Sequence, residues 1–257
     1  MTPSPWAMAH SAHRGLSMTV FAGVLNDDDA RRATEVVEAV HAHGIRCALT
    51  GGLAIDARLR EHGRPGMRRS LNDIDFVVED FASIPESLAG AFFQHHVHPD
   101  ANDGRTLLQL VDQPRAIRID LFCALGASLS RASKLTHEIG DLYVLSVEDL
   151  VARTTALVCG RLRRGGTIDV KHAVAFSRLR GLGQPQVLAA AWNDHRQQVP
   201  GTLEDASREA VRLLEAHPEL IVVENYSSTP VACGRCRAHG AFRPAPLETI
   251  VQILGYC

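Results

Sequence analysis

The sequence predicts an α/β fold, in the broad sense that includes α+β. We expect a mixed sheet flanked by helices, then a helical C-terminal part and a small tail with cysteines. Two observations predict this. Up to Leu145, short apolar segments typical of strands alternate with segments of helical periodicity. After Ser146 the pattern is helical almost throughout, with short Gly and Pro breaks. At 257 residues the chain is long enough for one large domain or two small ones.

The N-terminal segment 1–26 is expected to be disordered or variable. Its beginning is rich in Pro, Ser, Ala and His, and Met18 is an alternative start to Met1. We find no convincing signal-peptide cleavage site there and no stretch as long as a membrane span. The sequence therefore predicts a cytoplasmic protein without membrane contact. The first predicted helix covers 33–43, with Asp27 or Asp28 as its cap.

The first candidate site feature is a pair of glycines between a strand and a helix. Residues 45–50 are short and mostly apolar, which is typical of a buried strand, and they end at Gly51 and Gly52. Helical spacing follows over 53–60. Glycine lets a ligand approach the backbone closely, and the free N–H groups of a new helix suit a phosphate. The alternative interpretation is an ordinary turn.

Three aspartates form the second feature. Asp73 and Asp75 lie in an apolar segment with strand character, so alternation places both carboxylates on one face. Carboxylates this close repel each other unless a cation lies between them, and oxygen-only ligands suit Mg²⁺. Asp120 interrupts another apolar strand, 116–122. The alternatives are a solvated edge strand for the first two, and an exposed or ion-paired Asp120 beside Arg118.

The remaining elements follow from periodicity and turn signals. We expect a helix over 85–93, then strands near 94–98 and 105–111, separated by a loop rich in Asn, Asp and Gly. The helices expected after Ser146 cover 147–159, 167–180, 184–194 and 203–217.

With these residues in order, the chain resembles the nucleotidyltransferase superfamily that shares the DNA polymerase β-type fold. Within it, the chain is most similar to AbiEii-toxin-like and related uncharacterised bacterial nucleotidyltransferases. The similarity extends to the helix start at 145–150, Leu-Ser-Val-Glu-Asp-Leu, and to a later Asp-centred helix at 168–173. It covers about residues 28–180 of the sequence.

The resemblance implies a magnesium-dependent enzyme that transfers NMP from an NTP such as ATP to a hydroxyl acceptor. Asp73, Asp75 and Asp120 would be catalytic and would hold two Mg²⁺ ions. The nucleotide would contact Thr50, Gly51, Gly52, Arg69 and Lys171. Relatives carry a lysine about where Thr154 stands, next to Arg153, and their Arg-x-Thr motif is out of register here at Arg69. These departures concern triphosphate binding rather than metal binding.

The acceptor is left open. The resemblance allows RNA, such as a tRNA end, or a protein side chain, with the chain acting as a toxin and a neighbouring antitoxin as its partner. A small molecule such as an aminoglycoside, or a non-catalytic binding module on the same fold, are the alternatives. A shallow acidic pocket would favour the small molecule and a basic groove RNA. The net charge is −2, but Arg64, Arg68 and Arg69, and also Arg161, Arg163 and Arg164, form local basic clusters.

The tail carries a separate signal. Cys233 and Cys236 form a Cys-x-x-Cys pair, followed by His239 and by Cys257 at the end of the sequence. Such a set suits tetrahedral Zn²⁺, which would stabilise a short segment with little core. A redox pair and unreactive thiols are the alternatives. The other cysteines, Cys47, Cys123 and Cys159, lie in apolar elements and are expected to be reduced.

Together these signals predict four segments. They are the variable N-terminus 1–26, a nucleotidyltransferase core 27–145, a helical region 146–218, and the tail 219–257 with its candidate zinc knuckle.

Overall fold

The computed structural model describes residues 21, 24–64, 66, 71, 73–80, 84, 88, 94–97, 107–112, 117–135 and 142–223. Most of the helix expected over 85–93 therefore lies outside the described residues, as does the cysteine-containing tail. The elements in chain order are α2 (Asp27–Ala42), β1 (Cys47–Thr50), α3 (Gly51–Glu61), β2 (Asp73–Val78), β3 (Gln94–Val97), β4 (Leu107–Asp112), β5 (Ile117–Cys123), α5 (Ser128–Arg131), β6 (Ser133–Lys134), β7 (Tyr143–Val144), α6 (Val147–Arg163), β8 (Ile168–Asp169), α7 (Val170–Leu179), α8 (Pro185–His195), α9 (Leu203–Ala216), the 3₁₀ turn η2 (Pro218–Leu220) and β9 (Ile221–Val222).

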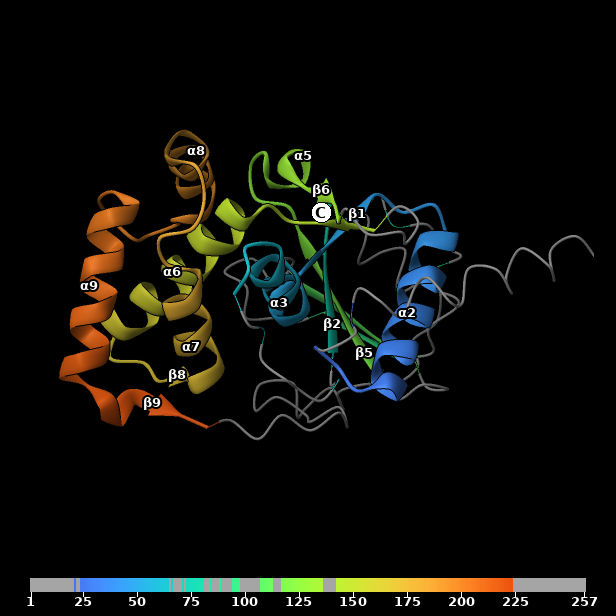
Figure 1. Cartoon of the computed structure of the whole chain (residues 1–257), viewed down its shortest axis with the longest axis horizontal. Coiled ribbons are helices and arrows are strands. Elements are labelled where there is room, and N and C mark those ends of the chain that lie inside the picture. The colour runs from blue at the N-terminus through green and yellow to red at the C-terminus, as the bar shows by residue number, and fades with distance from the viewer. Residues whose placement is uncertain are drawn as a thin grey trace, which may run out of the picture.

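A mixed sheet forms the centre of the molecule, as the sequence predicts. Its seven described strands run in the order β3-β4-β5-β2-β1-β7-β6. Strand β2 pairs in parallel with β5 and antiparallel with β1, while β4 is antiparallel to β5. Helix α2 lies on one side of this sheet and α3 on the other (Figure 1). The sheet is thus covered by helices on both faces, which buries its apolar residues.

Helix α2 begins earlier than expected, and its cap was predicted wrongly. The cap is Asn26, whose extended backbone lets its Oδ1 accept a hydrogen bond of 2.9 Å from the N–H of Asp29. Asp27 and Asp28 therefore fall in the first turn, where their charges favour the positive end of the helix dipole. Val36, Val37 and Val40 are buried in the same apolar core as the sheet.

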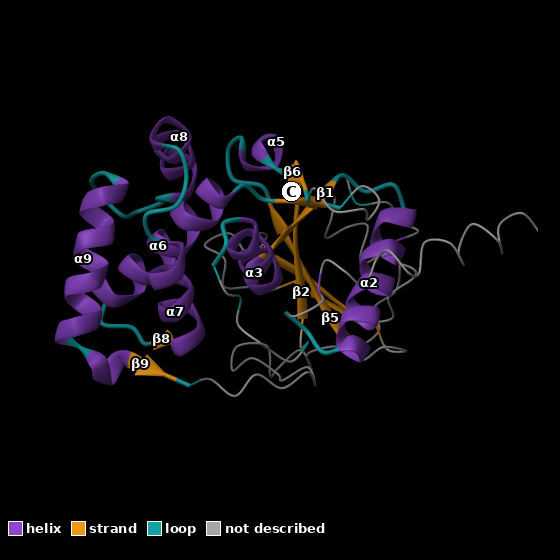
Figure 2. Cartoon of the chain, in the orientation of Figure 1, coloured by secondary structure: helices purple, strands orange, loops and turns teal. Residues whose placement is uncertain are grey.

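The helical region has an apolar cluster of its own. Figure 2 shows α6, α7, α8 and α9 grouped beside the sheet, with α6 in contact with the other three. Helix α6 continues past the expected residue 159 to Arg163, since Leu162 is still buried. The buried residues of the cluster include Val158, Leu162, Phe176, Ala191 and Trp192.

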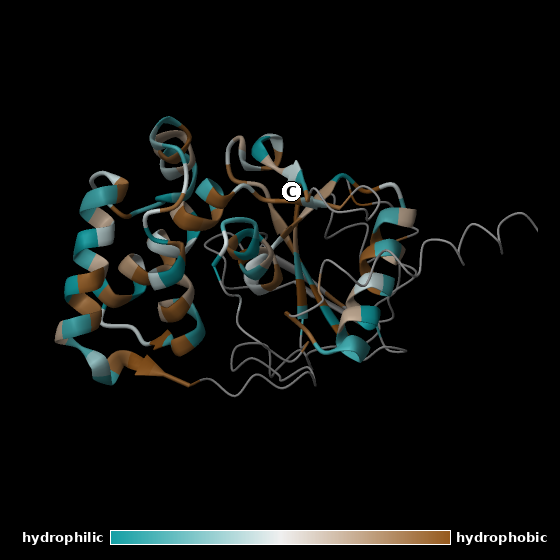
Figure 3. Cartoon of the chain, in the orientation of Figure 1, coloured by the Kyte–Doolittle hydropathy of each residue, from teal (hydrophilic) through white to brown (hydrophobic). Residues whose placement is uncertain are grey.

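A short strand precedes α7 where a continuous helix over 167–180 was predicted. Ile168–Asp169 pairs in parallel with Ile221–Val222, and the Asp169 side chain then caps α7. Figure 3 shows this partner strand β9 as hydrophobic. The pairing joins segments far apart in the sequence, so local periodicity gave no sign of it.

Two further findings concern the length of the helices and the state of the cysteines. Among the helices that the structure describes, none has the length and apolar content that a bilayer crossing needs. Cys47 and Cys159 are buried and Cys123 is half-buried, and all three are free thiols. Burial raises the pKa of the Cys47 thiol to about 12, so this cysteine is an unreactive core residue.

Candidate active site

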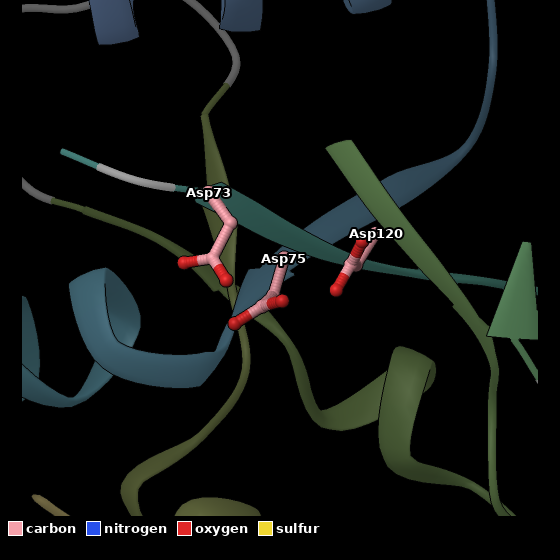
Figure 4. Close-up of side chains that lie close together, drawn as sticks. All are labelled: Asp73, Asp75 and Asp120. Atoms are coloured by element: carbon pink, nitrogen blue, oxygen red, sulfur yellow. The ribbon is translucent and has the colours of Figure 1, made fainter. Parts of the chain in front are cut away.

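The three predicted aspartates converge on one face of the sheet. In the parallel pairing of β2 with β5, Asp75 lies opposite Asp120 and Asp73 lies opposite Arg118. Alternation puts Asp73 and Asp75 on the same face, while Ile74 points to the other face and is fully buried. One carboxylate oxygen from each aspartate lies within 4.8 Å of those from the other two (Figure 4). We call Asp73, Asp75 and Asp120 the acidic triad.

The glycine turn touches the acidic triad directly. Thr50 pairs with Asp75 in the antiparallel β1–β2 ladder, and Gly51 then begins α3. The φ angle of Gly51 is +65°, and a Cβ on this residue would lie 1.7 Å from Oδ2 of Asp75. Only glycine fits at this position. The side chain of Thr50 does not cap α3, so the first N–H groups of the helix have no partner from the N-cap side chain.

Arg118 holds the two outer carboxylates. Its Nη2 pairs with Oδ2 of Asp73, and its Nε lies 3.0 Å from Oδ1 of Asp120. The side chain is 19% exposed, and its Nε makes this ion pair without a well-directed hydrogen bond among the described residues. The ion-paired Asp120 that the sequence left as an alternative is therefore present, together with the clustered carboxylates.

Arg153 reaches the site from α6. Its Nη1 donates a hydrogen bond of 2.9 Å to Oγ1 of Thr50, the residue before Gly51. Its guanidinium lies over the ring of Phe122, 4.6 Å from the centroid. Arg153 was not among the predicted site residues. The available signal was its place beside Thr154, where the superfamily that the sequence resembles carries a lysine.

The charges of the site do not balance. Burial, and then the charges of Asp73 and Asp120, raise the pKa of Asp75 well above its usual value, although Arg153 and Arg118 oppose this. Burial lowers the pKa of Arg153, which the charge of Asp75 counteracts. Three carboxylates face two guanidiniums, and a cation would relieve the remaining repulsion.

The donor set fits a hard divalent cation. All three triad side chains offer oxygen, which Mg²⁺ and Mn²⁺ prefer over nitrogen or sulfur ligands. The small separation of the oxygens permits shared coordination, and no bulky side chain can fill the glycine turn beside Asp75. The residues therefore suit the metal that the sequence predicts.

Of the other predicted residues, Gly52 adjoins the glycine turn, Lys171 lies on α7, and the rest lie outside the described part. Gly52 is the second residue of α3. Lys171 is in the first turn of α7, where its backbone N–H bonds to Oδ1 of Asp169 at 2.7 Å. Arg69 and the four tail residues predicted to bind zinc, Cys233, Cys236, His239 and Cys257, lie outside the described residues. Their roles stay predictions.

The comparisons with known proteins give a similarity to solved structures. No family model matches the chain. No curated protein matches it either. Among solved structures, the chain is similar to the antibiotic-resistance factor ANT(2'')-Ia, known from a solution structure, with a TM-score of 0.42 and 17% sequence identity. The similarity covers 73% of this chain and 95% of that one.

Proposed function

We propose that the protein is a divalent-cation-dependent nucleotidyltransferase, which moves a nucleoside monophosphate from an NTP to a hydroxyl acceptor. The observation that carries this proposal is the acidic triad in contact with the Gly51 turn. The oxygens of Asp73, Asp75 and Asp120 gather within 4.8 Å, beside the open N-terminus of α3. The N-terminus of a helix favours anions such as phosphate, and clustered carboxylates beside it favour cations. A site that holds both a metal and a phosphate satisfies the two preferences together.

The acidic triad would hold the metal. Asp75 and Asp120 face each other across the β2–β5 pairing, and Asp73 completes the ligand set from the same strand as Asp75. A bound divalent cation supplies positive charge against the phosphate oxygens and lowers the pKa of an acceptor hydroxyl. The binding of two ions, and their identity as Mg²⁺, stay predictions from the sequence resemblance.

The glycine turn and Arg153 would hold the triphosphate. The N–H groups of Gly51 and Gly52 lie at the positive end of α3, and no Cβ at Gly51 blocks the approach. Arg153 is fixed next to them by its bond to Thr50. A guanidinium offers several donors to phosphate oxygens in fixed geometry. We assign to Arg153 the role of the helix lysine that relatives carry one position later.

Positioning and electrostatics would supply most of the rate, as in phosphoryl transfer generally. Neither a histidine nor a cysteine nucleophile is required. The toxin role, the antitoxin, ATP as the preferred NTP and zinc in the tail stay predictions from the sequence.

The experiment follows label from the α-phosphate of each of the four NTPs, with Mg²⁺ or Mn²⁺. A pool of small RNAs, the protein itself and a panel of aminoglycosides serve as acceptors. Asp75→Asn is the matched inactive variant, because it keeps the side-chain shape and removes a ligand charge. Label on one acceptor class that is absent with Asp75→Asn supports the proposal. Equal labelling by the variant, or none with any combination, would overturn it.

A further inference from the structure

A basic pocket adjoins the acidic triad, and of the residues that line it the proposed roles use Arg153 alone. Its volume is about 630 Å³, and its lining includes Phe122, Arg153, Arg161, Arg164, Gln197 and Gln198. We call it the arginine pocket. Its lining comes from β2 and β5, the segment 125–128, α6 with its C-cap, and the end of α8 with the segment after it.

The pocket continues the face of the sheet that carries the carboxylates. Val77 and Phe122, which both line it, form the next same-face pair of the β2–β5 ladder after Asp75 and Asp120. Two residues along a strand span about 6.6 Å. Arg153 lines the pocket and also bonds to Thr50 at the site. A ligand in the pocket can therefore reach the triad without crossing the sheet.

The charge of the pocket is positive. Arg153 and Arg161 lie on α6, and Arg164 is the C-cap residue of that helix. They are eight and then three residues apart, which spans about 16 Å along a helix. Arg161 and Arg164 are exposed to solvent. No aspartate or glutamate is among the residues that line the pocket in the described part of the chain.

The neighbouring carboxylates are already engaged elsewhere. Asp149 accepts hydrogen bonds from Arg131, and Asp194 pairs with the same arginine. Glu209 pairs with Arg163, which lies on α6 between the two pocket arginines but does not line the pocket. These carboxylates pair with Arg131 and Arg163, so the positive charge of Arg161 and Arg164 is available to a ligand in the pocket.

Two more polar features face it. His195 lines the pocket and is 4% exposed; its Nε2 lies 3.0 Å from Asp149, while its buried Nδ1 has no hydrogen-bond partner among the described residues. Gln197 has a φ of +47°, a left-handed conformation that non-glycine residues seldom adopt. Gln197 and Gln198 both line the pocket.

Resting on the proposed function, we propose that the arginine pocket receives the phosphodiester backbone of a single-stranded nucleic-acid acceptor and leads its terminal hydroxyl to the triad. A row of arginines matches an acceptor that carries one negative charge on each nucleotide. A polycationic acceptor such as an aminoglycoside would be repelled by the same row. The amides and the histidine offer hydrogen bonds to phosphates or bases.

The arginine pocket and the glycine turn lie on opposite sides of Asp75 along β2, as the acceptor and the leaving pyrophosphate require. Because β1 and β2 are antiparallel, Gly51, which follows Thr50, lies on the Asp73 side of Asp75 along β2. The pocket begins at Val77, on the other side of Asp75. Phosphoryl transfer keeps the attacking and leaving oxygens roughly in line on opposite sides of phosphorus. With the leaving pyrophosphate at the glycine turn, the attacking hydroxyl enters from the arginine pocket.

The test measures binding of the acceptor without the reaction. Fluorescence anisotropy with a short fluorescein-labelled single-stranded RNA, in the absence of NTP, compares the wild-type chain with the double variant Arg161→Ala, Arg164→Ala. The matched control is Arg163→Ala, which removes a charge from the same turn but faces Glu209. Titrations at several salt concentrations give the slope of log affinity against log salt. DNA of the same sequence and an unlabelled aminoglycoside serve as competitors.

We expect the double variant to bind RNA at least about tenfold more weakly, and the salt slope to fall by about 0.7 for each arginine removed. Arg163→Ala should bind nearly as the wild type does, and the aminoglycoside should not displace the RNA. Competition by DNA identifies single-stranded phosphodiester as the recognised chemistry, and no competition restricts it to RNA. Wild-type RNA affinity in the double variant, equal loss in Arg163→Ala, or displacement by the aminoglycoside would overturn the proposal. Because no NTP is present, failure here is distinguishable from failure of nucleotidyl transfer.

Discussion

Arg153 donates a hydrogen bond of 2.9 Å from its Nη1 to Oγ1 of Thr50, across 103 residues of sequence. The bond joins α6, the first helix of the helical region, to the last residue of β1, directly before the glycine turn. The same guanidinium packs on the ring of Phe122, 4.6 Å from its centroid, and it is held from two sides. A cation fixed beside a turn that suits phosphate favours triphosphate binding.

Substitution of Arg153 should affect nucleotide affinity. A hydrogen bond to a charged group contributes about 1.5–3 kcal/mol, so we expect Arg153→Met to raise the Kd for an NTP by about ten- to hundredfold. Arg153→Lys keeps the charge and should lose less. Calorimetric titration with a non-hydrolysable NTP analogue gives both values. Wild-type NTP affinity in Arg153→Met would show that Arg153 does not bind the triphosphate.

The glycine turn gives a second prediction. Gly51→Ala forces a left-handed conformation on alanine, at a cost of about 1–2 kcal/mol, and pushes its Cβ against Oδ2 of Asp75. We expect metal binding and transfer to be lost while the fold remains. Gly63→Ala is the matched control, since its φ is +67° but nothing lies within 4 Å of the added Cβ. Mn²⁺ titration and circular dichroism compare the two. Normal metal binding in Gly51→Ala would contradict the proposed site.

Arg118 should compete with the metal. Its guanidinium pairs with Asp73 and Asp120, two of the three proposed metal ligands. Without it, the metal-free triad is less neutralised, so Arg118→Gln should unfold at a lower temperature and should bind Mn²⁺ more tightly. Thermal unfolding with and without Mn²⁺ measures both effects. The control is Arg46→Gln, which breaks only an exposed ion pair with Glu79. Weaker Mn²⁺ binding in Arg118→Gln would mean that the arginine supports the metal site.

The sequence allowed the acidic triad to be predicted because the side-chain period of a strand is fixed. Asp73 and Asp75 must share a face of β2, and the apolar residues around them identify that strand. The position of Asp75 opposite Asp120 depends on the register of β2 and β5, which pair although β3 and β4 lie between them in the sequence. The sequence shows which residue types form the triad, but not the distances between their carboxylates.

The two arginines show the limit more sharply. Arg118 was predicted only as an alternative partner of Asp120, since neighbouring residues on a strand suggest such a pair. The contact of Arg153 with Thr50 depends on how α6 packs across the sheet, which no local pattern encodes. The cap at Asn26 was missed for a smaller reason: three aspartates follow it, and any of them is a good N-cap.

A buried carboxylate in the first turn of α6, Asp149, should contribute to the stability at acid pH. Burial favours the neutral form of Asp149, but hydrogen bonds from His195, Arg131 and Ser146 outweigh it and hold its pKa below the usual value. A lowered pKa in the folded state contributes stability that is present above the unfolded pKa and is lost as pH falls through the folded one. Stability should therefore fall on acidification below the ordinary carboxyl range.

Asp149→Asn tests this directly. Removing the charge leaves Arg131 partly unpaired in a buried site, and we expect a loss of about 3 kcal/mol at neutral pH. The difference from the wild type should shrink as pH falls. Urea unfolding at several pH values measures it. A pH-independent difference would show that the charge of Asp149 contributes nothing.

The central claim is that the acidic triad binds a divalent cation together with a nucleoside triphosphate. The most direct measurement is an electron paramagnetic resonance titration of Mn²⁺ into the wild-type chain and into Asp75→Asn, with and without a non-hydrolysable NTP analogue. We predict Mn²⁺ binding to the wild type that the analogue strengthens. In Asp75→Asn we predict affinity lower by about a hundredfold, because loss of a metal contact costs several kcal/mol. Equal binding by both proteins, or binding that the analogue leaves unchanged, would contradict the proposed site.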